Sequence, residues 1–253
     1  MKRGFTLLEM TAVIGVIALL THLAVRELGA YRDMKLAAQA DRQLEDIRAA
    51  ACRFLHDVGR LPRLTAETND VGEVAWTLSE LWKRPAGMVE CRRVEKDGVQ
   101  LAAGWRGPYL KMAFGRDRLL DPWGNPVESE DSAGLRRLWA DGSSLVTNVC
   151  HYGPSAQEPA RRSVSLLPDG GTSATLIVSV DAGAYSGPLE CGWYGAYENS
   201  VTNETVSLAA AGGQIVFENV PCGKKAVRVS GGRTVVRLVD VEGPVTQIGL
   251  KVQ

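Results

Sequence analysis

The first 25 residues constrain this chain more than any other segment. Met1–Gly4 carries two cations, and the run from Phe5 to Val25 is predominantly apolar but contains one acid, Glu9. The 21 residues of this run are enough to cross a bilayer core of roughly 30 Å as a helix. An ionised carboxylate in hydrocarbon costs several kcal/mol. An apolar segment that keeps Glu9 therefore needs something that compensates its charge.

Two simple interpretations account for only part of this segment. A secretory signal peptide should end in a small-residue cleavage site, whereas this run ends in Thr21-His22-Leu23-Ala24-Val25-Arg26. A plain membrane anchor explains the length, but it gives no reason for Glu9 or for a Gly4-Phe5 junction behind a cationic stub. Lys2 and Arg3 predict a cytoplasmic N-terminus with the bulk of the chain on the other side of the membrane.

The stub, the Gly4-Phe5 junction and Glu9 together resemble the leader of type IV prepilins and pseudopilins. The resemblance implies that a prepilin peptidase cuts between Gly4 and Phe5, and that the new amine of Phe5 is methylated. It also implies that Glu9, now the fifth residue, meets the N-terminal amine of a neighbouring subunit. The implied partners are the prepilin peptidase, other pilin or pseudopilin subunits, the inner membrane, and a secretion or pilus assembly platform.

The anchor is expected to continue as an amphipathic helix. Between Leu28 and Val58 the apolar residues recur in steps of three and four, and charged residues fill the other faces. No proline precedes Pro62, and Gly59 supplies a stop signal. The sequence therefore predicts one helix of about 50 residues, about 75 Å long. Its transmembrane half covers 5–25 and its amphipathic half covers 26–58.

Three blocks follow the helix in a recognisable order. They are Gly59-Arg60-Leu61-Pro62, then Trp105-Arg106-Gly107-Pro108-Tyr109-Leu110, then Leu120-Asp121-Pro122-Trp123-Gly124-Asn125-Pro126. Their order resembles the major pseudopilin of type II secretion systems, which implies a pseudopilin-like α/β head over 59–154. Proline, glycine and asparagine here fix turns, and Tyr109 and Trp123 offer apolar faces that can hold the loops against the long helix. A short amphipathic helix is expected over Val74–Trp82.

The head departs from that family at its calcium loop. Val127 stands where an aromatic residue is usual, and Ser155 where an acid is expected. Asp141 is the one candidate calcium ligand, while calcium binds six to eight oxygen atoms. Calcium at Asp141 stays an open alternative, and no other metal or cofactor is expected.

The C-terminal third changes in composition. Residues 155–171 are rich in proline and glycine and indicate a linker, and 172–253 holds short β-like runs separated by turn signals. This pattern predicts an antiparallel β-sandwich. The run Ile215–Val229 resembles a hairpin of transthyretin-like domains, which include carboxypeptidase regulatory-like modules. The expected fold class is α+β: a long N-terminal helix packed on a small head, followed by the sandwich.

Catalytic patterns are missing from the sequence. The chain has five cysteines without a C-x-x-C pair, and three scattered histidines. A disulfide between Cys191 and Cys222 is one expectation for an oxidising compartment, and buried free thiols are the alternative. Lysine plus arginine and aspartate plus glutamate both number 29, so no net charge favours nucleic acid. We expect neither an enzyme nor a nucleic-acid-binding protein.

These observations predict a structural subunit with a single membrane span, a cytoplasmic N-terminus and periplasmic C-terminal domains. The block order favours a type II secretion pseudopilus, a short filament that helps export folded proteins. A minor type IV pilus subunit that displays an adhesive β-domain is the first alternative. A membrane-tethered binding module that does not polymerise is the second.

Overall fold

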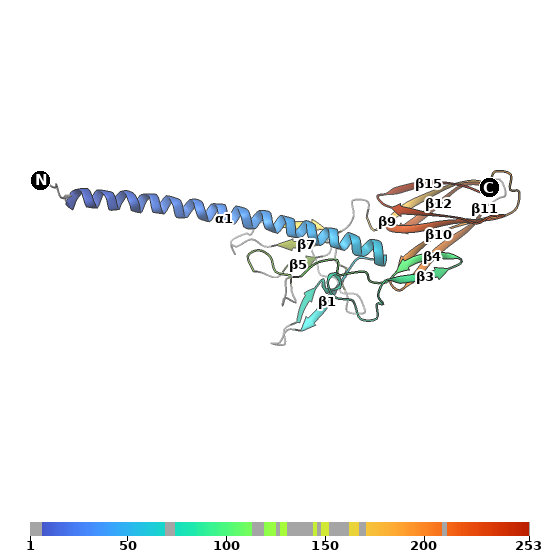
Figure 1. The fold of residues 1–253 in the computed structure, drawn as a ribbon, viewed down its shortest axis with the longest axis horizontal. Coiled ribbons are helices and arrows are strands. Elements are labelled where there is room, and N and C mark those ends of the chain that lie inside the picture. The colour runs from blue at the N-terminus through green and yellow to red at the C-terminus, as the bar shows by residue number, and fades with distance from the viewer. Residues whose placement is uncertain are drawn as a thin grey trace.

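The computed structural model shows an α+β chain in which one long helix is followed by β-sheets (Figure 1). It describes residues 7–68, 74–112, 119–124, 127–130, 144–145, 148–151, 162–166, 171–208 and 212–252. Helix α1 spans Leu7–Val58, 52 residues, so the long helix expected from the apolar spacing is confirmed. Its N-terminal half projects away from the rest of the molecule, and the C-terminal half lies against the sheets.

Helix α1 ends where the sequence predicted. Gly59 adopts φ +83°, and its N–H donates to the Leu55 carbonyl at 2.8 Å. A left-handed residue just past the last turn is a common helix terminator, and glycine adopts it without steric cost. The buried stripe of α1 consists of Ala40, Leu44, Ile47, Ala50, Ala51, Phe54, Leu55 and Val58. The expected stripe is confirmed from Ala40 onward, whereas Tyr31, which was expected to belong to it, is 52% exposed.

Short strands follow α1 in the sequence. Strand β1 (Arg63–Thr68) lies between β2 (Val74–Thr77) and β6 (Ser144–Leu145). Strand β7 (Asn148–His151) lies between β5 (Glu128–Glu130) and β8 (Arg162–Ser165). A hairpin is formed by β3 (Arg92–Lys96) and β4 (Val99–Ala103), and one 3-10 turn, η1, covers Ser79–Leu81. Of these strands, β4, β7 and β8 contact α1.

The helix expected over Val74–Trp82 is wrong. Residues Val74–Thr77 form β2, which pairs antiparallel with β1, and only η1 is helical. Valine, tryptophan and threonine fit a pleated strand better than a helix. Isolated short helices are only marginally stable. In a segment this short, a neighbouring strand that offers backbone hydrogen-bond partners therefore favours the strand over the helix.

The C-terminal domain is a sandwich of two sheets. One sheet has the order β11-β10-β13-β14, formed by Ser200–Leu208, Leu189–Tyr197, Gly223–Ser230 and Val235–Val241. The other has the order β12-β9-β15, formed by Gly212–Pro221, Ser173–Asp181 and Val245–Lys251. A strand covers each run that the sequence predicted. The sandwich is not wholly antiparallel, because β15 pairs parallel with β9.

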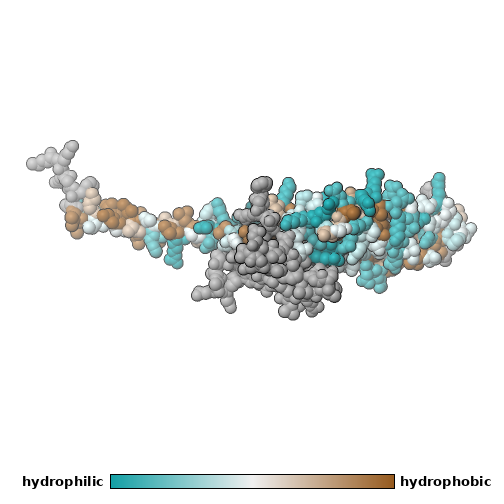
Figure 2. Space-filling view, turned by 90° about the horizontal axis from the view of Figure 1, so that it is seen from below, coloured by the Kyte–Doolittle hydropathy of each residue, from teal (hydrophilic) through white to brown (hydrophobic). Residues whose placement is uncertain are grey.

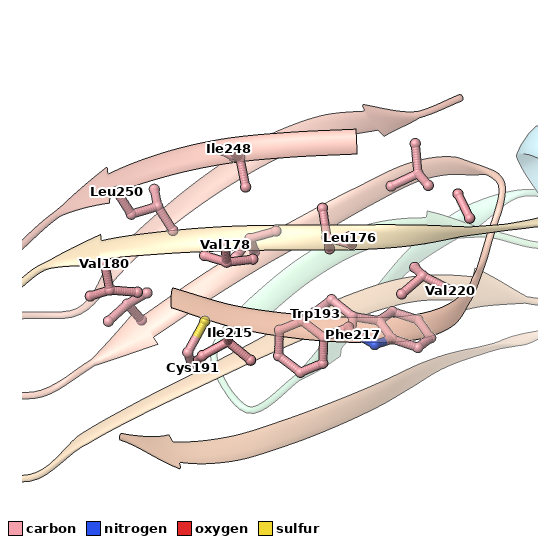
Figure 3. Close-up of a cluster of buried hydrophobic side chains, with 14 of the residues drawn as sticks. Leu176, Val178, Val180, Cys191, Trp193, Ile215, Phe217, Val220, Ile248 and Leu250 are labelled. Atoms are coloured by element: carbon pink, nitrogen blue, oxygen red, sulfur yellow. The ribbon is translucent and has the colours of Figure 1, made fainter. Parts of the chain in front are cut away.

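The sandwich core lies between the two sheets (Figure 3). Strand β9 alternates buried and half-buried residues, which directs Leu176, Val178 and Val180 inward. Trp193 and Cys191 on β10 face them from the other sheet. Burying a large aliphatic side chain stabilises the fold by about 1.5–3 kcal/mol, so this alternation fixes the register of each strand.

Of the predicted linker 155–171, the structure describes 162–166 and 171. Strand β8 within it pairs with β7 from Asn148↔Ser165 to His151↔Arg162. Leu166 is fully buried in the cluster that surrounds α1, together with Ile47 and Phe54. Residues 162–166 of this stretch are therefore packed against the head.

The β3–β4 hairpin packs against the sandwich. Val99 and Leu101 of β4 form a buried cluster with Tyr194, Val201 and Ala226. In β10 and β13 these residues alternate with those of the sandwich core, so the hairpin covers the outer face of that sheet. By packing, the hairpin belongs to the sandwich although it lies in the middle of the head sequence.

Candidate functional site

The N-terminal half of α1 is one candidate site because its apolar side chains are exposed. Large apolar residues from Leu7, 86% exposed, to Met34, 63% exposed, project from the helix. In Figure 2 this half is predominantly brown, whereas hydrophilic residues dominate the visible described surface of the sheets. Among the described residues α1 is the one helix long and apolar enough to cross a membrane. The described part of the chain therefore has one apolar helix suited to a membrane anchor or signal segment.

Glu9 lies in the first turn of α1, at the start of this apolar surface. The helix dipole favours an acid in the first turn by about 0.3–1 kcal/mol. A charged residue at the centre of a spanning helix costs roughly 2.5–3.5 kcal/mol or more. Glu9 lies near one end of the helix instead, where the cost is smaller and the dipole offsets part of it.

The C-terminal half of α1 is seated by aromatic packing. The Tyr109 ring meets the Phe54 ring edge-on at 5.4 Å and the Trp105 ring at 6.1 Å. Arg53 Nη2 donates to the Tyr109 carbonyl at 3.0 Å, and Gln43 Nε2 donates to the Leu120 carbonyl at 2.9 Å. Both blocks therefore contact the long helix; the expected packing of Tyr109 on it is confirmed, whereas the second block contacts it through the Leu120 carbonyl.

Arg60, directly after the helix, joins three parts of the chain. Its Nη1 and Nη2 donate to the two oxygens of Glu80 at 2.7 and 3.0 Å, and its Nε donates to Glu198 Oε1 at 2.8 Å. The side chains of Arg60 and Glu80 are only 12% and 5% exposed. Burial lowers the pKa of Arg60, but the hydrogen bonds and charges of Glu80 and Glu198 outweigh burial and raise it. We call Arg60, Glu80 and Glu198 the Arg60 network.

The turn between β10 and β11 holds the end of the helix. The Glu198 N–H donates to the Val58 carbonyl at 2.7 Å, which satisfies one of the carbonyls left open at the helix end. A Cβ on Gly59 would collide with the Ala196 carbonyl, so the chain can pass this close only at a glycine. Asn199 accepts from the Val89 N–H and donates to the Gly87 carbonyl, both at 2.8 Å. The turn thus fixes the sandwich to both the helix and the head.

Lys225 is a buried cation at the same junction. It is 1% exposed, and its Nζ donates to the Cys222 carbonyl at 3.3 Å. Its side chain crosses Gly195, where an added Cβ would lie 2.6 Å from Lys225 Cδ. Burial lowers the pKa of Lys225 to about 8, against a small opposing effect from Cys222. At neutral pH the junction therefore bears the cost of a poorly solvated ammonium group.

Two open hollows adjoin the junction. One, of about 370 Å³, lies between the end of α1, β4 and β14. The other, of about 480 Å³, is lined by Cys52 and by the loop that carries Tyr109. They share His56, Asp57, Arg106 and Lys224 as lining residues. Arg106 Nη1 and Asp57 Oδ1 lie 3.2 Å apart between them.

The residues expected to carry function are only partly within the described structure. Gly4, Phe5 and Asp141 lie outside the described residues, and Glu9 lies at the start of α1. Among the described residues, no group of three or more histidine, cysteine, aspartate or glutamate side chains is arranged to hold a metal ion.

The disulfide expected between Cys191 and Cys222 is not formed. Both residues are buried free thiols. Cys191 lies opposite Val229, seven residues along β13 from Cys222. At about 3.3 Å per residue this separates them by about 20 Å, whereas a disulfide needs Cα atoms within about 7 Å.

Sequence reasoning missed the roles of Arg60, Glu80 and Glu198. One signal was available at Glu80, an acid flanked by Leu78, Leu81 and Trp82 in a segment otherwise suited to burial. A carboxylate in such surroundings needs a cation. The sequence did not indicate which of the many arginines would supply it.

Comparisons with known proteins add little. No protein-family model and no curated protein matches the chain. Among solved structures, the archaeal oligosaccharyltransferase AglB from Archaeoglobus fulgidus, in complex with an inhibitory peptide and a dolichol-phosphate, is similar over 40% of this chain. The match has 11% sequence identity and a TM-score of 0.20, and it covers 12% of the AglB chain. Similarity at this level carries no argument about fold or function.

Replacing Glu80 should destabilise the junction. Glu80→Gln leaves the buried guanidinium of Arg60 without one of its two carboxylates, which costs about 3 kcal/mol. The control is Glu90→Gln, because the Glu90 side chain is 85% exposed and lies 3.7 Å from Arg84; it should change stability by less than about 0.5 kcal/mol. Urea unfolding of the detergent-solubilised chain, followed by tryptophan fluorescence, measures both. Equal midpoints for the two variants would contradict the stabilising role of the network.

Replacing Lys225 should change how stability depends on pH. Because the folded-state pKa lies near 8, below the usual 10.5, the unfolded chain binds more protons between these values. Stability should therefore rise with pH across this window, by on the order of 3 kcal/mol. Lys225→Met removes this contribution, so the variant should exceed the wild type near pH 7 and the gap should narrow towards pH 10. Urea midpoints over this range test it, and a gap that does not change with pH would contradict it.

Proposed function

We propose that this chain is a pilin-like structural subunit that a prepilin peptidase processes and that assembles into a type II secretion pseudopilus. The observation that carries the proposal is the division of α1. One continuous helix presents exposed apolar side chains over its first half and is seated in a folded head over its second half. A filament subunit needs this division, because one part of the helix must pack on neighbours while the other part holds the head.

The length of the exposed apolar surface supports packing against other helices. From Leu7 to Met34 the helix covers about 40 Å at 1.5 Å per residue. This exceeds a hydrocarbon core of roughly 30 Å. Leu28, Tyr31 and Met34 lie beyond the 5–25 segment and are more than half exposed. Neighbouring subunits in a filament would cover these side chains, whereas a lone anchor leaves them in water.

Glu9 would supply the charge that sets the register between subunits. In the proposed filament its carboxylate faces the N-terminal amine of a neighbour within an apolar core. A buried ion pair of this kind contributes little net stability compared with apolar packing, but losing one partner is costly. The pair therefore selects one arrangement of helices among several that bury similar apolar area.

A minor type IV pilus subunit is the second candidate function. The observation that favours it is the position of the sandwich at the opposite end of the molecule from the N-terminus (Figure 1). A domain in that position can be displayed at a filament tip for adhesion. A membrane-tethered binding module that does not polymerise is the third candidate, and the two experiments below separate it from the filament subunits.

Processing should depend on Gly4. When the chain is co-expressed with a prepilin peptidase, we expect it to lose residues 1–4 and to begin at methylated Phe5. Gly4→Leu should remain uncut, because the pocket on that side of the scissile bond must admit the side chain. Intact mass and N-terminal sequencing of the membrane fraction, with and without the peptidase, measure this. A wild-type chain that begins at Met1 in both samples would overturn the pilin class.

Assembly should depend on Glu9 after processing has taken place. Glu9→Val should be cut normally but should lower cross-linked or sheared filament material by about tenfold or more, equivalent to ~1.4 kcal/mol per contact. Glu45→Val is the matched control, since Glu45 is an exposed acid of α1 in the half that seats the head, outside the proposed packing surface. If both variants assemble like the wild type, Glu9 has no role in assembly. Cross-linking to pseudopilins or to pilus subunits in the same samples separates the two filament types.

A further inference from the structure

The start of β13 lies directly on the last turns of α1. Gly223 adopts φ +109°, and a Cβ built on it would lie 2.9 Å from His56 Cα and 3.1 Å from the His56 carbonyl oxygen. Both are backbone atoms that cannot move aside, so only glycine permits this approach. Cys222 directly precedes Gly223, and consecutive Cα atoms lie about 3.8 Å apart. Cys222 is therefore one residue away from this contact with the helix.

Cys52 lies on the same part of the helix. It precedes His56 by four residues, which places the two side chains on one face about one turn apart. Cys52 is half-buried and lines the 480 Å³ hollow together with His56 and Lys224, the residue after Gly223. The hollow thus joins the helix turn that carries Cys52 to the first residues of β13.

Cys222 belongs to the same buried cluster as Leu55, which lies three residues after Cys52 on the same face of α1. Cys222 is 2% exposed, and its Sγ lies 3.6 Å from the Gly171 carbonyl oxygen. Burial raises the pKa of the Cys222 thiol, the charge of Lys225 opposes this effect, and Glu242 and Cys52 add to it.

We propose that Cys52 and Cys222 form a disulfide that fastens the last turns of α1 to the β-sandwich. The bond joins two residues far apart in sequence, across the contact where the helix meets β13. Formation in the cell rests on the proposed function, because that function places these domains in an oxidising periplasm. The structure contains both residues as reduced thiols.

The reaction is an ordinary thiol–disulfide exchange in two steps. The Cys52 thiol, which reaches the hollow, loses its proton and attacks a disulfide of the oxidant, which can be a small disulfide or a thiol–disulfide oxidoreductase. One oxidant sulfur leaves as a thiolate and takes a proton. The Cys222 thiol then attacks Cys52 Sγ in the mixed disulfide and releases the second oxidant sulfur. Two cysteine thiols lose two electrons and two protons, and the oxidant disulfide becomes two thiols.

The other described cysteines do not offer this pairing. Cys191 lies in the sandwich core about 20 Å along the sheet from Cys222. Cys91 accepts a hydrogen bond from Arg106 Nη2 at 3.6 Å, next to the start of β3. Cys91 is half-buried, as Cys52 is, so it serves as the matched control for accessibility.

The first experiment oxidises the full-length chain in detergent with oxidised glutathione. Remaining thiols are blocked with N-ethylmaleimide, and the chain is digested and mapped by mass spectrometry without reductant. We expect a cross-linked pair of peptides containing Cys52 and Cys222, lighter by about 2 Da than the sum of the two free peptides. Cys91→Ser should form the same pair, whereas Cys52→Ser should leave Cys222 labelled with N-ethylmaleimide once the chain is unfolded. A Cys222 that stays a thiol in the oxidised wild type, or that pairs elsewhere, would overturn the proposal.

Unfolding in urea provides a second test, which shows whether each variant is folded. Reducing the oxidised wild type should lower its urea midpoint, because the bond restricts the unfolded chain. Cys52→Ser alters a half-buried position rather than the buried Cys222, and its midpoint should not respond to reductant. A midpoint that responds to reductant equally in both proteins would contradict the Cys52–Cys222 bond.

A second experiment separates this proposal from the proposed function. The chain is taken from cells lysed in N-ethylmaleimide, and the same sample is used for peptide mapping and for N-terminal sequencing. We expect the Cys52–Cys222 pair together with processing at Gly4. Cells that contain processed chain without the bond would overturn the disulfide and leave the subunit class standing. Unprocessed chain that carries the bond would support the disulfide and overturn the subunit class.

Discussion

The rest of the structure depends on how the end of α1 is held. Arg60 leaves the helix and binds Glu80 with two hydrogen bonds, while a third goes to Glu198 on the β10–β11 turn. The same turn donates to the last carbonyl of the helix at Val58. Helix, head and sandwich therefore meet at one guanidinium group. Because its fork geometry matches a carboxylate only in a narrow range of orientations, the network fixes direction as well as contact.

Apolar packing and the Arg60 network have different tasks in this fold. The stripe of α1 and the facing sheets bury side chains that each stabilise by about 1.5–3 kcal/mol, and such packing tolerates several similar arrangements. A buried ion pair adds little net stability but is costly to break. The core therefore provides most of the free energy of folding, and the network selects the arrangement in which α1 enters the sandwich. Leu55 and Leu61 show the coupling, since both lie in the sandwich core on either side of Arg60.

The parts of the fold that the sequence predicted are those set by local periodicity. Helix α1 follows from steps of three and four residues, and the sandwich strands follow from short alternating runs between turn residues. Contacts between distant segments decided the rest. Val74–Thr77 became a strand because β1 was available beside it, and Leu166 is buried beside α1 although it lies in a stretch whose composition predicted a linker. The residues that contact Glu80 and Cys222 come from distant parts of the sequence, and no local pattern predicts them. Of the candidate site, Glu9 could be singled out in advance because an acid in an apolar run conflicts with its surroundings.

The geometry of the junction determines how a displacement of α1 would be transmitted. Axial movement of the helix acts first on its last turn, where the Val58 carbonyl and Arg60 both connect to Glu198. Asn199 continues this connection to the 87–89 loop of the head, and Gly223 brings β13 against His56 from the other side. The sandwich therefore follows the helix as a rigid extension rather than trailing from it on a flexible tether. In the filament that we propose, each added subunit would then advance the sandwich together with its helix.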